Sequence, residues 1–506
     1  MGVEKQKTKN IKTVVFCIIL LTGIDSNHLT ANSVTWNLKS LYGITQTGFA
    51  SIIKDAKNHF TYSPTDTITI RIDAGTYSIG GNGADGISLS SIGSASTVGQ
   101  LIFEGAGMDQ TTLIFTDITQ DMIHGSDVYG LEFRDMHMTR DRYTVTQGNV
   151  VSVVPGEIII ELHEGFPTPL ELWQDWSQGR FLRRYTTSTT DPEVIAVDND
   201  QVPYGWRSNA AKKPELVQGR QWRFYLNSTT LLLSNYHVGE YVGIKSKFEG
   251  QTYWFQRGSN LVFENIKWTH SSRGLVRGGL SNVLVKGCRI ERGAPILGQT
   301  PCMSTPSGGP QMNQYVSSGD PLSTNMVLED CFIESTGDDC VAFFNVDGGK
   351  VINSTLRNSF CRGILVSQEA YNICVIGTTI PNSKIELEDK PSVSPNLRTP
   401  VSTYDLEVAY AANFINKSCD SIPSSISNDI YTPDSFSIFP NPTSSSLTVR
   451  LKTLDAITIE ISNLLGKVLI QKQNQLTFDI SNLPKGVYLL SVKQGENRFI
   501  RKFIKK

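Results

Sequence analysis

Five segments in the second half of the chain repeat one arrangement of apolar and polar positions. Each has an apolar residue, a small polar or glycine residue two places later, and another apolar residue three places after that. They begin at Phe263, Val285, Leu328, Val351 and Val375, in steps of 22, 43, 23 and 24 residues. A step of 43 is close to two repeats with an inserted loop. Short strands and tight turns at this period are typical of a parallel β-helix, in which matching positions stack.

The repeat predicts an all-β protein whose main unit is a right-handed parallel β-helix from roughly Asp66 to Asn382, because parallel β crossovers are almost always right-handed. Earlier coils are indicated at Leu101–Gly105 and Leu131–Met138. Apolar residues at helical spacing in Gly48–Phe60 predict an amphipathic helix before the first coil. Such a helix would cover the open end of the β-helix, where unpaired strand edges otherwise invite aggregation.

The period breaks between Gly148 and Lys247, where alternating strand runs and turn residues predict an inserted β subdomain. This segment contains four of the seven tryptophans, together with many basic residues: Trp173, Trp176, Trp206 and Trp222, with Arg180, Arg183, Arg184, Arg207, Lys212, Lys213, Arg220 and Arg223. Exposed aromatic rings beside basic groups would stack on sugar rings and pair with anionic substituents. Alternatively, the tryptophans form the core of the insert. Both interpretations stay open.

Charge and hydropathy restrict the environment and the partners. A formal net charge of −2 argues against general nucleic-acid binding. Four lysines between Lys5 and Lys12 precede the apolar run Val14–Leu21, which is the order of a secretory signal peptide. The run is too short to span a bilayer, and no other stretch is expected to be a transmembrane segment.

Seven of the eight cysteines follow the signal peptide. Cys288 and Cys331 occupy the same position of the repeat, and Ser354 and Thr378 follow there in the next two repeats. A buried ladder of small residues is therefore expected in preference to disulfide bonds. No cysteine has the spacing of a metal site, and neither a metal nor another cofactor is expected.

The last 70 or so residues carry several landmarks in a fixed order. They are Phe436–Pro442 (FSIFPNP), Ile459–Lys467 (IEISNLLGK), Asp479–Tyr488 (DISNLPKGVY) and the basic strand Phe499–Lys506. This segment resembles the C-terminal sorting domain of the type IX (Por) secretion system. The resemblance implies interaction with the type IX machinery and export to the cell surface or beyond. The alternating strands and Gly/Pro turns predict a small β-sandwich.

These patterns divide the chain into six parts. They are a signal peptide (1–26), an N-terminal cap with the first coils (27–147), the inserted β subdomain (148–247), the main coils with the candidate site (248–382), a closing segment and linker (383–433), and the sorting domain (434–506).

The segment Ser335–Phe343 (STGDDCVAF) resembles the Gly-Asp-Asp motif of β-helical glycoside hydrolases. Polygalacturonases carry this motif, and family 110 α-galactosidases use a comparable pair. The resemblance implies that Asp338 and Asp339 are the catalytic acid and base. Inverting hydrolysis needs one carboxyl group to protonate the leaving oxygen and another to activate water, about 6.5–9.5 Å apart. Neighbouring residues can both face a groove only at a turn, because they point to opposite faces of a strand.

The surroundings of the pair depart from the polygalacturonase pattern. Where those enzymes have Gly-His-Gly on the following coil, this chain has Arg362, and the preceding coil is replaced by a loop whose only carboxylate is Asp320. In the predicted register Asp339 stacks on Arg362, and Arg273 falls within one residue of the same position. The further substrate-binding candidates are His270, Glu291 and Arg292. Arginines there could hold a uronate or sulfate group, or neutralise the stacked carboxylates.

Together, these features favour a secreted glycoside hydrolase that cleaves a plant or algal polysaccharide or a galactose-containing glycan. Two alternatives remain. A polysaccharide lyase would use an arginine as base, with Arg273, Arg292 and Arg362 as candidates, and Asp338 and Asp339 as Ca²⁺ ligands. A non-catalytic surface protein would only bind glycans.

Overall fold

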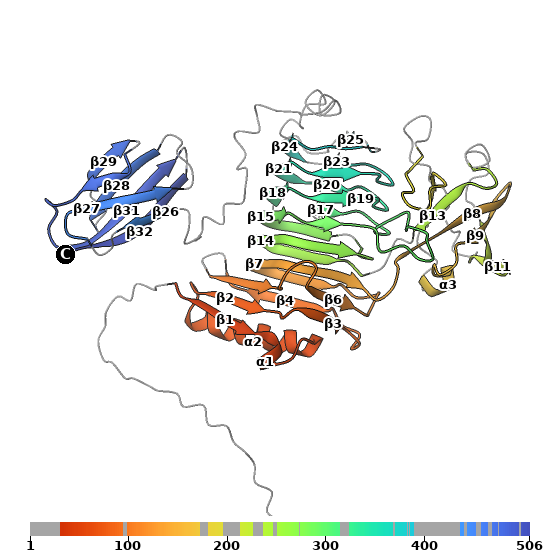
Figure 1. Cartoon of the computed structure of the whole chain (residues 1–506), viewed down its shortest axis with the longest axis horizontal. Coiled ribbons are helices and arrows are strands. Elements are labelled where there is room, and N and C mark those ends of the chain that lie inside the picture. Colours follow the sequence, from red (N-terminus) through yellow and green to blue (C-terminus); the bar gives the residue numbers. More distant parts are fainter. Residues whose placement is uncertain are drawn as a thin grey trace, which may run out of the picture.

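The computed structural model describes residues 31–94, 99–172, 181–195, 213–225, 236–245, 250–272, 274–313, 323–367, 370–381, 383, 385–388, 436–439, 443–451, 457–463, 468–473, 475–494 and 497–506. The expected signal peptide (1–26) and most of the closing segment and linker (383–433) lie outside these residues. Figure 1 shows stacked strands above a short helical layer, a lateral β subdomain and a C-terminal unit.

The main unit is a parallel β-helix, as predicted. Nineteen strands form one continuous parallel sheet that winds through successive coils. They are β1 (Ser33–Asn37), β2 (Thr67–Arg71), β3 (Gly75–Ile79), β4 (Ile87–Ile92), β5 (Gln100–Glu104), β6 (Thr111–Phe115), β7 (Ile123–Arg140), β14 (Tyr253–Thr269), β15 (Gly274–Lys286), β16 (Arg289–Ile290), β17 (Pro310–Asn313), β18 (Ser323–Glu329), β19 (Phe332–Glu334), β20 (Val341–Phe344), β21 (Val346–Ile352), β22 (Thr355–Arg357), β23 (Ile364–Ser367), β24 (Tyr371–Ile376) and β25 (Ile385–Glu388).

The sequence repeat sets the register of these coils. Phe263 pairs with Val285, Val285 with Leu328, Leu328 with Val351, and Val351 with Val375. All five side chains are buried in one continuous apolar core. The predicted stacking of the repeat is therefore confirmed. The 43-residue step is not two repeats, however, because Val285 pairs directly with Leu328: it is one coil with an inserted loop.

Asparagines in the left-handed conformation bend three successive coils at matching positions. Asn260, Asn282 and Asn325 have φ angles of 58°, 57° and 53°. Asparagine tolerates this conformation better than most residues because its short polar side chain bonds locally. The Asn325 side-chain amide donates to Asn282 Oδ1 at 2.9 Å, and that of Asn282 donates to Asn260 Oδ1 at 3.0 Å. These hydrogen bonds link the three amides from coil to coil.

Two helices, α1 (Leu38–Leu41) and α2 (Gln46–Tyr62), cover the first coil beneath β1, β2 and β4 (Figure 1). The hydroxyl of Thr45 accepts a hydrogen bond from Gly48 N and caps α2 at its N-terminus. The apolar face of α2 is buried, and Phe49 on this face packs against Phe103 with ring centroids 5.9 Å apart. The helix predicted at Gly48–Phe60 is confirmed, with two further residues at each end.

The long excursions of the chain leave the β-helix at one edge, here called the variable corner. It comprises the turns 80–86, 116–122, 335–340 and 358–363, together with the connections 141–252 and 291–309. Each precedes one of the strands β4, β7, β14, β17, β20 and β23. These strands stack in one ladder with β15, which lies between β14 and β17 and whose preceding residues 270–272 are at the same corner. Because all of these segments stack at one edge, polar groups from distant parts of the sequence meet there.

The connection between β7 and β14 forms a separate antiparallel sheet, at the right of Figure 1. Its elements are β8 (Val145–Val154), β9 (Glu157–Leu162), α3 (Pro169–Leu172), β10 (Phe181–Tyr185), β11 (Glu215–Gln218), β12 (Gln221–Tyr225) and β13 (Tyr241–Lys245). Trp222 is buried in its core with Ile158, Ile160 and Leu182. Trp222 is thus a core residue, while Trp173, Trp176 and Trp206 lie outside the described residues.

The C-terminal unit has two antiparallel sheets that share one apolar core and form a small β-sandwich, as predicted. The smaller sheet contains β26 (Phe436–Phe439), β27 (Ser446–Leu451) and β30 (Thr477–Asp479). The larger sheet contains β28 (Ile457–Asn463), β29 (Val468–Gln473), β31 (Gly486–Gln494) and β32 (Asn497–Lys505). Leu447 and Phe478 from one sheet pack with Leu490 and Phe503 from the other.

The cysteine ladder is present. Cys288 and Cys331 are buried free thiols, and the Ser354 hydroxyl accepts a hydrogen bond from Cys331 N at 3.1 Å. Thr378 Oγ1 in turn accepts from Ser354 N at 3.3 Å. Cys374 is disulfide-bonded, which the repeat did not indicate.

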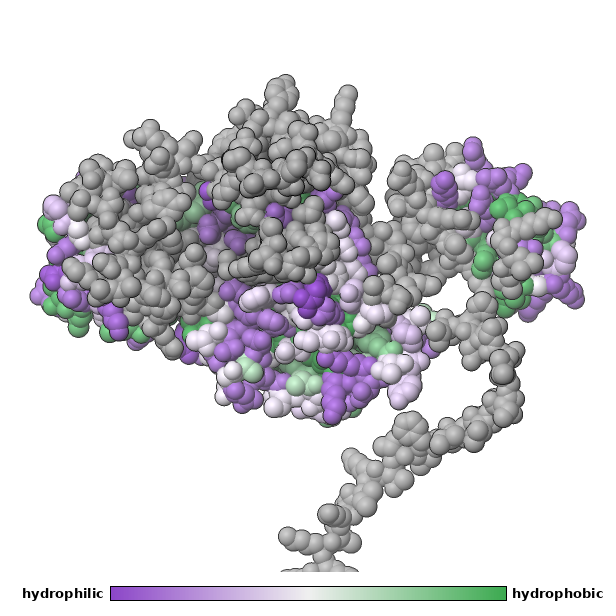
Figure 2. Space-filling model, turned by 180° about the vertical axis from the view of Figure 1, so that it is seen from behind, coloured by the Kyte–Doolittle hydropathy of each residue, from purple (hydrophilic) through white to green (hydrophobic). Residues whose placement is uncertain are grey.

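The surface is mixed in character. The face turned away from Figure 1 is mostly hydrophilic where described residues form it, with scattered apolar side chains (Figure 2). None of the helices in the described ranges has the length and apolar character needed to cross a membrane.

A stack of three phenylalanines provides a test of the core. Phe103, Phe133 and Phe263 lie in consecutive coils, with centroids 4.8 and 5.9 Å apart, and all are fully buried. We expect Phe133→Ala to lower the free energy of unfolding by about 4 kcal/mol, because it removes the central ring and leaves a cavity. Urea unfolding followed by circular dichroism measures this. Tyr62→Ala, at an 84% exposed position, is the control and should change stability by less than about 0.5 kcal/mol. Equal effects of the two changes would contradict the packing argument.

Candidate active site

The acidic pair lies on the variable corner, in the turn between β19 and β20. Thr336 Oγ1 donates to the carbonyl of Asp338 at 2.9 Å and shapes the turn. A side chain at Gly337 would lie 2.5 Å from the backbone of Pro306 on the neighbouring loop, so the close approach of the two segments requires glycine. The turn is therefore held tightly against the preceding coil.

Asp339 stacks on Arg362 of the next coil, as the register predicted. Val341 pairs with Ile364, so the residues two places before them lie at matching positions. Arg362 Nη1 donates to Asp339 Oδ1 at 3.2 Å, and Cys340 N donates to the carbonyl of Arg362 at 2.8 Å. The Asp339 side chain is buried, which makes the adjacent positive charge of Arg362 important for keeping it ionised.

Asp338 is half-buried and lies beside the sulfur of Cys361. One oxygen of Asp338, one oxygen of Asp339 and the Cys361 sulfur lie within 4.8 Å of one another. Such a group could hold a cation, but the guanidinium of Arg362 already neutralises Asp339. The closest carboxylate oxygens are nearer than the separation of about 6.5–9.5 Å between carboxyl groups in inverting enzymes. The pair therefore leaves less room for a water between the two carboxyl groups than inverting enzymes have.

His270 lies on the same corner, at the end of β14. Its ring packs on Tyr143, with centroids 4.0 Å apart, and its Nε2 has no hydrogen-bond partner among the described residues. Burial lowers the pKa of His270 to about 4, so the ring is neutral at pH 7. Its unpaired Nε2 is itself buried and lies against Gly293, so the ring is packed into the corner and does not present this nitrogen to a ligand.

Arg292 belongs to a buried ion-pair network that joins the insert to the β-helix. Its Nη2 lies 2.6 Å from Asp191 Oδ1 and 2.9 Å from Glu334 Oε2. Arg357 contacts the same two carboxylates, at 2.8 and 3.1 Å. Burial raises the pKa of Asp191, but the two arginines outweigh it and hold the pKa below its ordinary value. The charge of Arg292 is therefore already balanced by protein groups.

The other sequence candidates divide into two groups. Glu291 forms an ion pair with Arg289 near the surface, two residues away along the chain. Arg273 and Asp320 lie outside the described residues, so their positions in the site remain predictions.

The insert forms a wall beside the acidic pair. Asn358, in the turn that carries Arg362, accepts a hydrogen bond from Val194 N and donates to the carbonyl of Pro192 at 3.0 Å. Arg183 of β10 lies over the ring of Phe360, 5.3 Å from its centroid. The insert thus leaves the β-helix at the variable corner and packs against it again at the candidate site.

Sequence reasoning missed several of these residues. Glu334 and Arg357 sit one coil apart at matching positions, so the register could have revealed them. No signal pointed to Asp191, because it comes from the insert, whose packing the repeat does not describe. Nothing in the sequence singled out Cys361, because no cysteine has the spacing of a metal site.

The network provides a test of whether Arg292 is structural. We expect Arg292→Met to lower the free energy of unfolding by about 3 kcal/mol, because it leaves the buried Glu334 carboxylate without one of its two partners. Urea unfolding measures this change. Arg289→Met is the matched control: the side chain of Arg289 is 51% exposed, so loss of its ion pair should change stability little. A variant of Arg292 with wild-type stability but a raised KM would instead assign this residue to substrate binding.

Comparisons with known proteins give one matching family model and several distant structural neighbours. No curated protein matches the chain. Among solved structures, the catalytic domain of Agl-KA is 13% identical with a TM-score of 0.33, and the match covers 73% of this chain but only 45% of that one. A polygalacturonase from Erwinia carotovora is 9% identical (TM-score 0.29, 73% of this chain and 85% of that one). A mannuronan C-5 epimerase A-module from Azotobacter vinelandii is 11% identical (TM-score 0.21, 70% and 91%).

These structural neighbours are carbohydrate-active β-helical proteins at low identity. The chain spans less than half the length of the first of them. Residues 437–506 match the secretion system C-terminal sorting domain. This agrees with the β-sandwich of β26–β32 and with the order of landmarks in the sequence. The chain therefore carries a type IX secretion signal at its C-terminal end and is exported to the cell surface or the extracellular space.

Proposed function

We propose that this protein is a glycoside hydrolase that cleaves a plant or algal polysaccharide or a galactose-containing glycan outside the cell. The observation that carries the proposal is the acidic pair Asp338 and Asp339, which is placed on a turn and balanced by Arg362 from the next coil. The insert packs against the β-helix beside this pair. Export by the type IX pathway brings the protein to the outside of the cell, where such polysaccharides occur.

The two carboxyl groups differ in environment, which suits different roles. Asp339 is buried and contacts Arg362, so its carboxylate form is stabilised and can accept a proton from water. Asp338 is half-buried, whereas Asp339 is buried and paired with Arg362, so we assign Asp338 the role of the protonated acid. In the proposed reaction Asp338 donates its proton to the glycosidic oxygen while the bond from that oxygen to the anomeric carbon breaks. The water that loses a proton to Asp339 forms the new bond to that carbon, with inversion.

Substrate binding is proposed to involve residues around the pair. Arg362 could contact an anionic sugar substituent as well as Asp339. His270 is a weaker candidate, because its unpaired Nε2 is buried against Gly293. Arg273 and Asp320 remain candidates from the sequence. Arg292 and Glu291 are weaker candidates, because ion pairs with neighbouring residues already use their charges.

Substitution of the pair tests the proposal. We expect Asp338→Asn and Asp339→Asn each to lower kcat by a factor of about 100 or more, because each removes a titratable group while keeping the shape of the side chain. The assay is the release of reducing ends from a panel of plant and algal glycans. Asp330→Asn is the matched control, because Asp330 occupies another turn of the same coil, at φ 53°, which asparagine tolerates. Near-full activity of both folded variants would refute the assignment.

The products distinguish the alternatives. Hydrolysis gives products without the ultraviolet absorbance of unsaturated uronates, whereas a lyase gives products with that absorbance. Proton NMR of the first product identifies its anomer, and retention would argue against the proposed role of Asp339 as base. Binding without any product would favour a glycan-binding protein.

The sorting domain should be dispensable for chemistry. We expect removal of residues 434–506 to abolish delivery to the cell surface and to leave kcat/KM of the purified protein within about twofold of the full chain, since this unit has its own core. Fractionation of the producing cells and glycan digestion are the two measurements. Loss of purified activity on truncation would show that the tail contributes to the site.

A further inference from the structure

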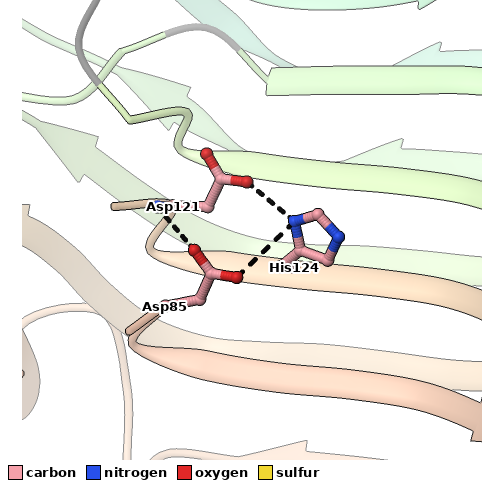
Figure 3. Close-up of side chains that lie close together, drawn as sticks. All are labelled: Asp85, Asp121 and His124. Atoms are coloured by element: carbon pink, nitrogen blue, oxygen red, sulfur yellow. Dashed lines mark hydrogen bonds and ion pairs between the residues drawn. The ribbon is translucent and has the colours of Figure 1, made fainter. Parts of the chain in front are cut away.

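A second group of possible ligand side chains lies on the variable corner, nearer the N-terminal end. Asp85, Asp121 and His124 converge at the starts of β4 and β7 (Figure 3). His124 Nδ1 lies 2.9 Å from Asp121 Oδ2 and 3.7 Å from Asp85 Oδ2. One atom from each of the three residues lies within 4.8 Å of the others.

The ladder of parallel strands builds this group. Ile87 pairs with Ile123, so Asp85 and Asp121 occupy matching positions on adjacent coils, two residues before the paired strands. Asp85 Oδ1 accepts from Asp121 N at 3.0 Å, and Asp121 Oδ1 accepts from Gln251 N at 2.6 Å. Each carboxylate is therefore anchored by one oxygen, and its second oxygen points toward the imidazole. The ring of Trp254 packs on His124, with centroids 5.3 Å apart.

The charge balance differs from that at Asp338 and Asp339. In the described part of the chain, no lysine or arginine forms an ion pair with Asp85 or Asp121, and His124 is their ion-pair partner. At Asp339, by contrast, Arg362 supplies a permanent positive charge. All three side chains retain some exposure, with side-chain values of 25% for Asp85, 11% for Asp121 and 32% for His124, so an ion can reach them.

The distances fit a small divalent ion. Zinc binds imidazole nitrogen and carboxylate oxygen at about 2.0–2.2 Å, so ligand atoms around a tetrahedral ion lie about 3.4 Å apart. The two distances to Nδ1, 2.9 and 3.7 Å, fall on either side of this value. The single imidazole favours a first-row transition ion over Ca²⁺ or Mg²⁺, which prefer oxygen ligands throughout.

We propose that Asp85, Asp121 and His124 form a divalent transition-metal site that fastens the first coils of the β-helix at the variable corner. His124 binds through Nδ1 and keeps its proton on Nε2, and the proton displaced from Nδ1 goes to solvent. The carboxylates come from adjacent coils, so one ion links the turns before β4 and β7. Asp121 and Asp339 each lie two residues before a strand of the same ladder, and four coils separate them. At the usual strand spacing this places the two residues about 19 Å apart. The site is therefore separate from the acidic pair.

Zinc titration of the untagged full chain, stripped with a chelator, tests the proposal directly. Isothermal titration calorimetry should detect one Zn²⁺ bound at this site with a dissociation constant in the micromolar range or below, and Zn²⁺ should raise the thermal unfolding midpoint by about 3 °C or more. His124→Gln and Asp121→Asn should each weaken this binding at least tenfold and remove the shift in the midpoint. Asp85→Asn provides a third, independent variant, so a folding failure of one change does not end the test.

Cys361→Ser is the matched control, because it alters the other three-ligand group and should leave zinc affinity unchanged. The proposal would be overturned if the wild-type chain did not bind Zn²⁺ even at a Zn²⁺ concentration of about 100 μM, 100-fold above the expected dissociation constant. It would also be overturned by binding that survives in folded His124→Gln and Asp121→Asn chains, or that is lost in Cys361→Ser. In any of these results the cluster is a hydrogen-bonded staple without an ion.

Discussion

The register of the parallel strands is the constraint on which the rest of the structure depends. Each coil buries apolar side chains directly above those of the coil before it, as Phe263, Val285, Leu328, Val351 and Val375 do. A slip of one residue would turn every such side chain to the other face of its strand. Apolar burial in a continuous column therefore determines the height and the rotation of each coil, and with them the position of every turn.

Because the strand register is fixed, the large insertions of the chain lie together at the variable corner. Elsewhere in the described coils, left-handed asparagines such as Asn260, Asn282 and Asn325 make tight bends. At the variable corner, insertions do not disturb the ladder, because a strand can leave the stack and return without changing its register. The large insert, the loop before β17 and the turn with Asp338 and Asp339 all use this freedom.

The corner also explains why charged groups there have partners from distant segments. Asp339 meets Arg362 because both precede strands of one ladder. Asp191 meets Arg292 and Arg357 because the insert folds back onto the coils above its point of departure. The first pairing follows from register alone. The second depends on how two separate apolar cores pack, and its ion pairs fix the wall beside the acidic pair.

The sequence by itself determined the β-helix, its register, the capping helix, the cysteine ladder and the sorting domain, because each of these leaves a local or periodic pattern. It also placed Asp339 against Arg362, since a fixed period converts spacing directly into stacking. Only the tertiary structure decided that Trp222 is a core residue, that Arg292 is held by Asp191 and Glu334, and that Asp85, Asp121 and His124 converge. The insert and its ion pairs follow no period, and the convergence of the three residues depends on side-chain directions. Such contacts form when separately folded segments pack together, a step that repeat spacing does not encode.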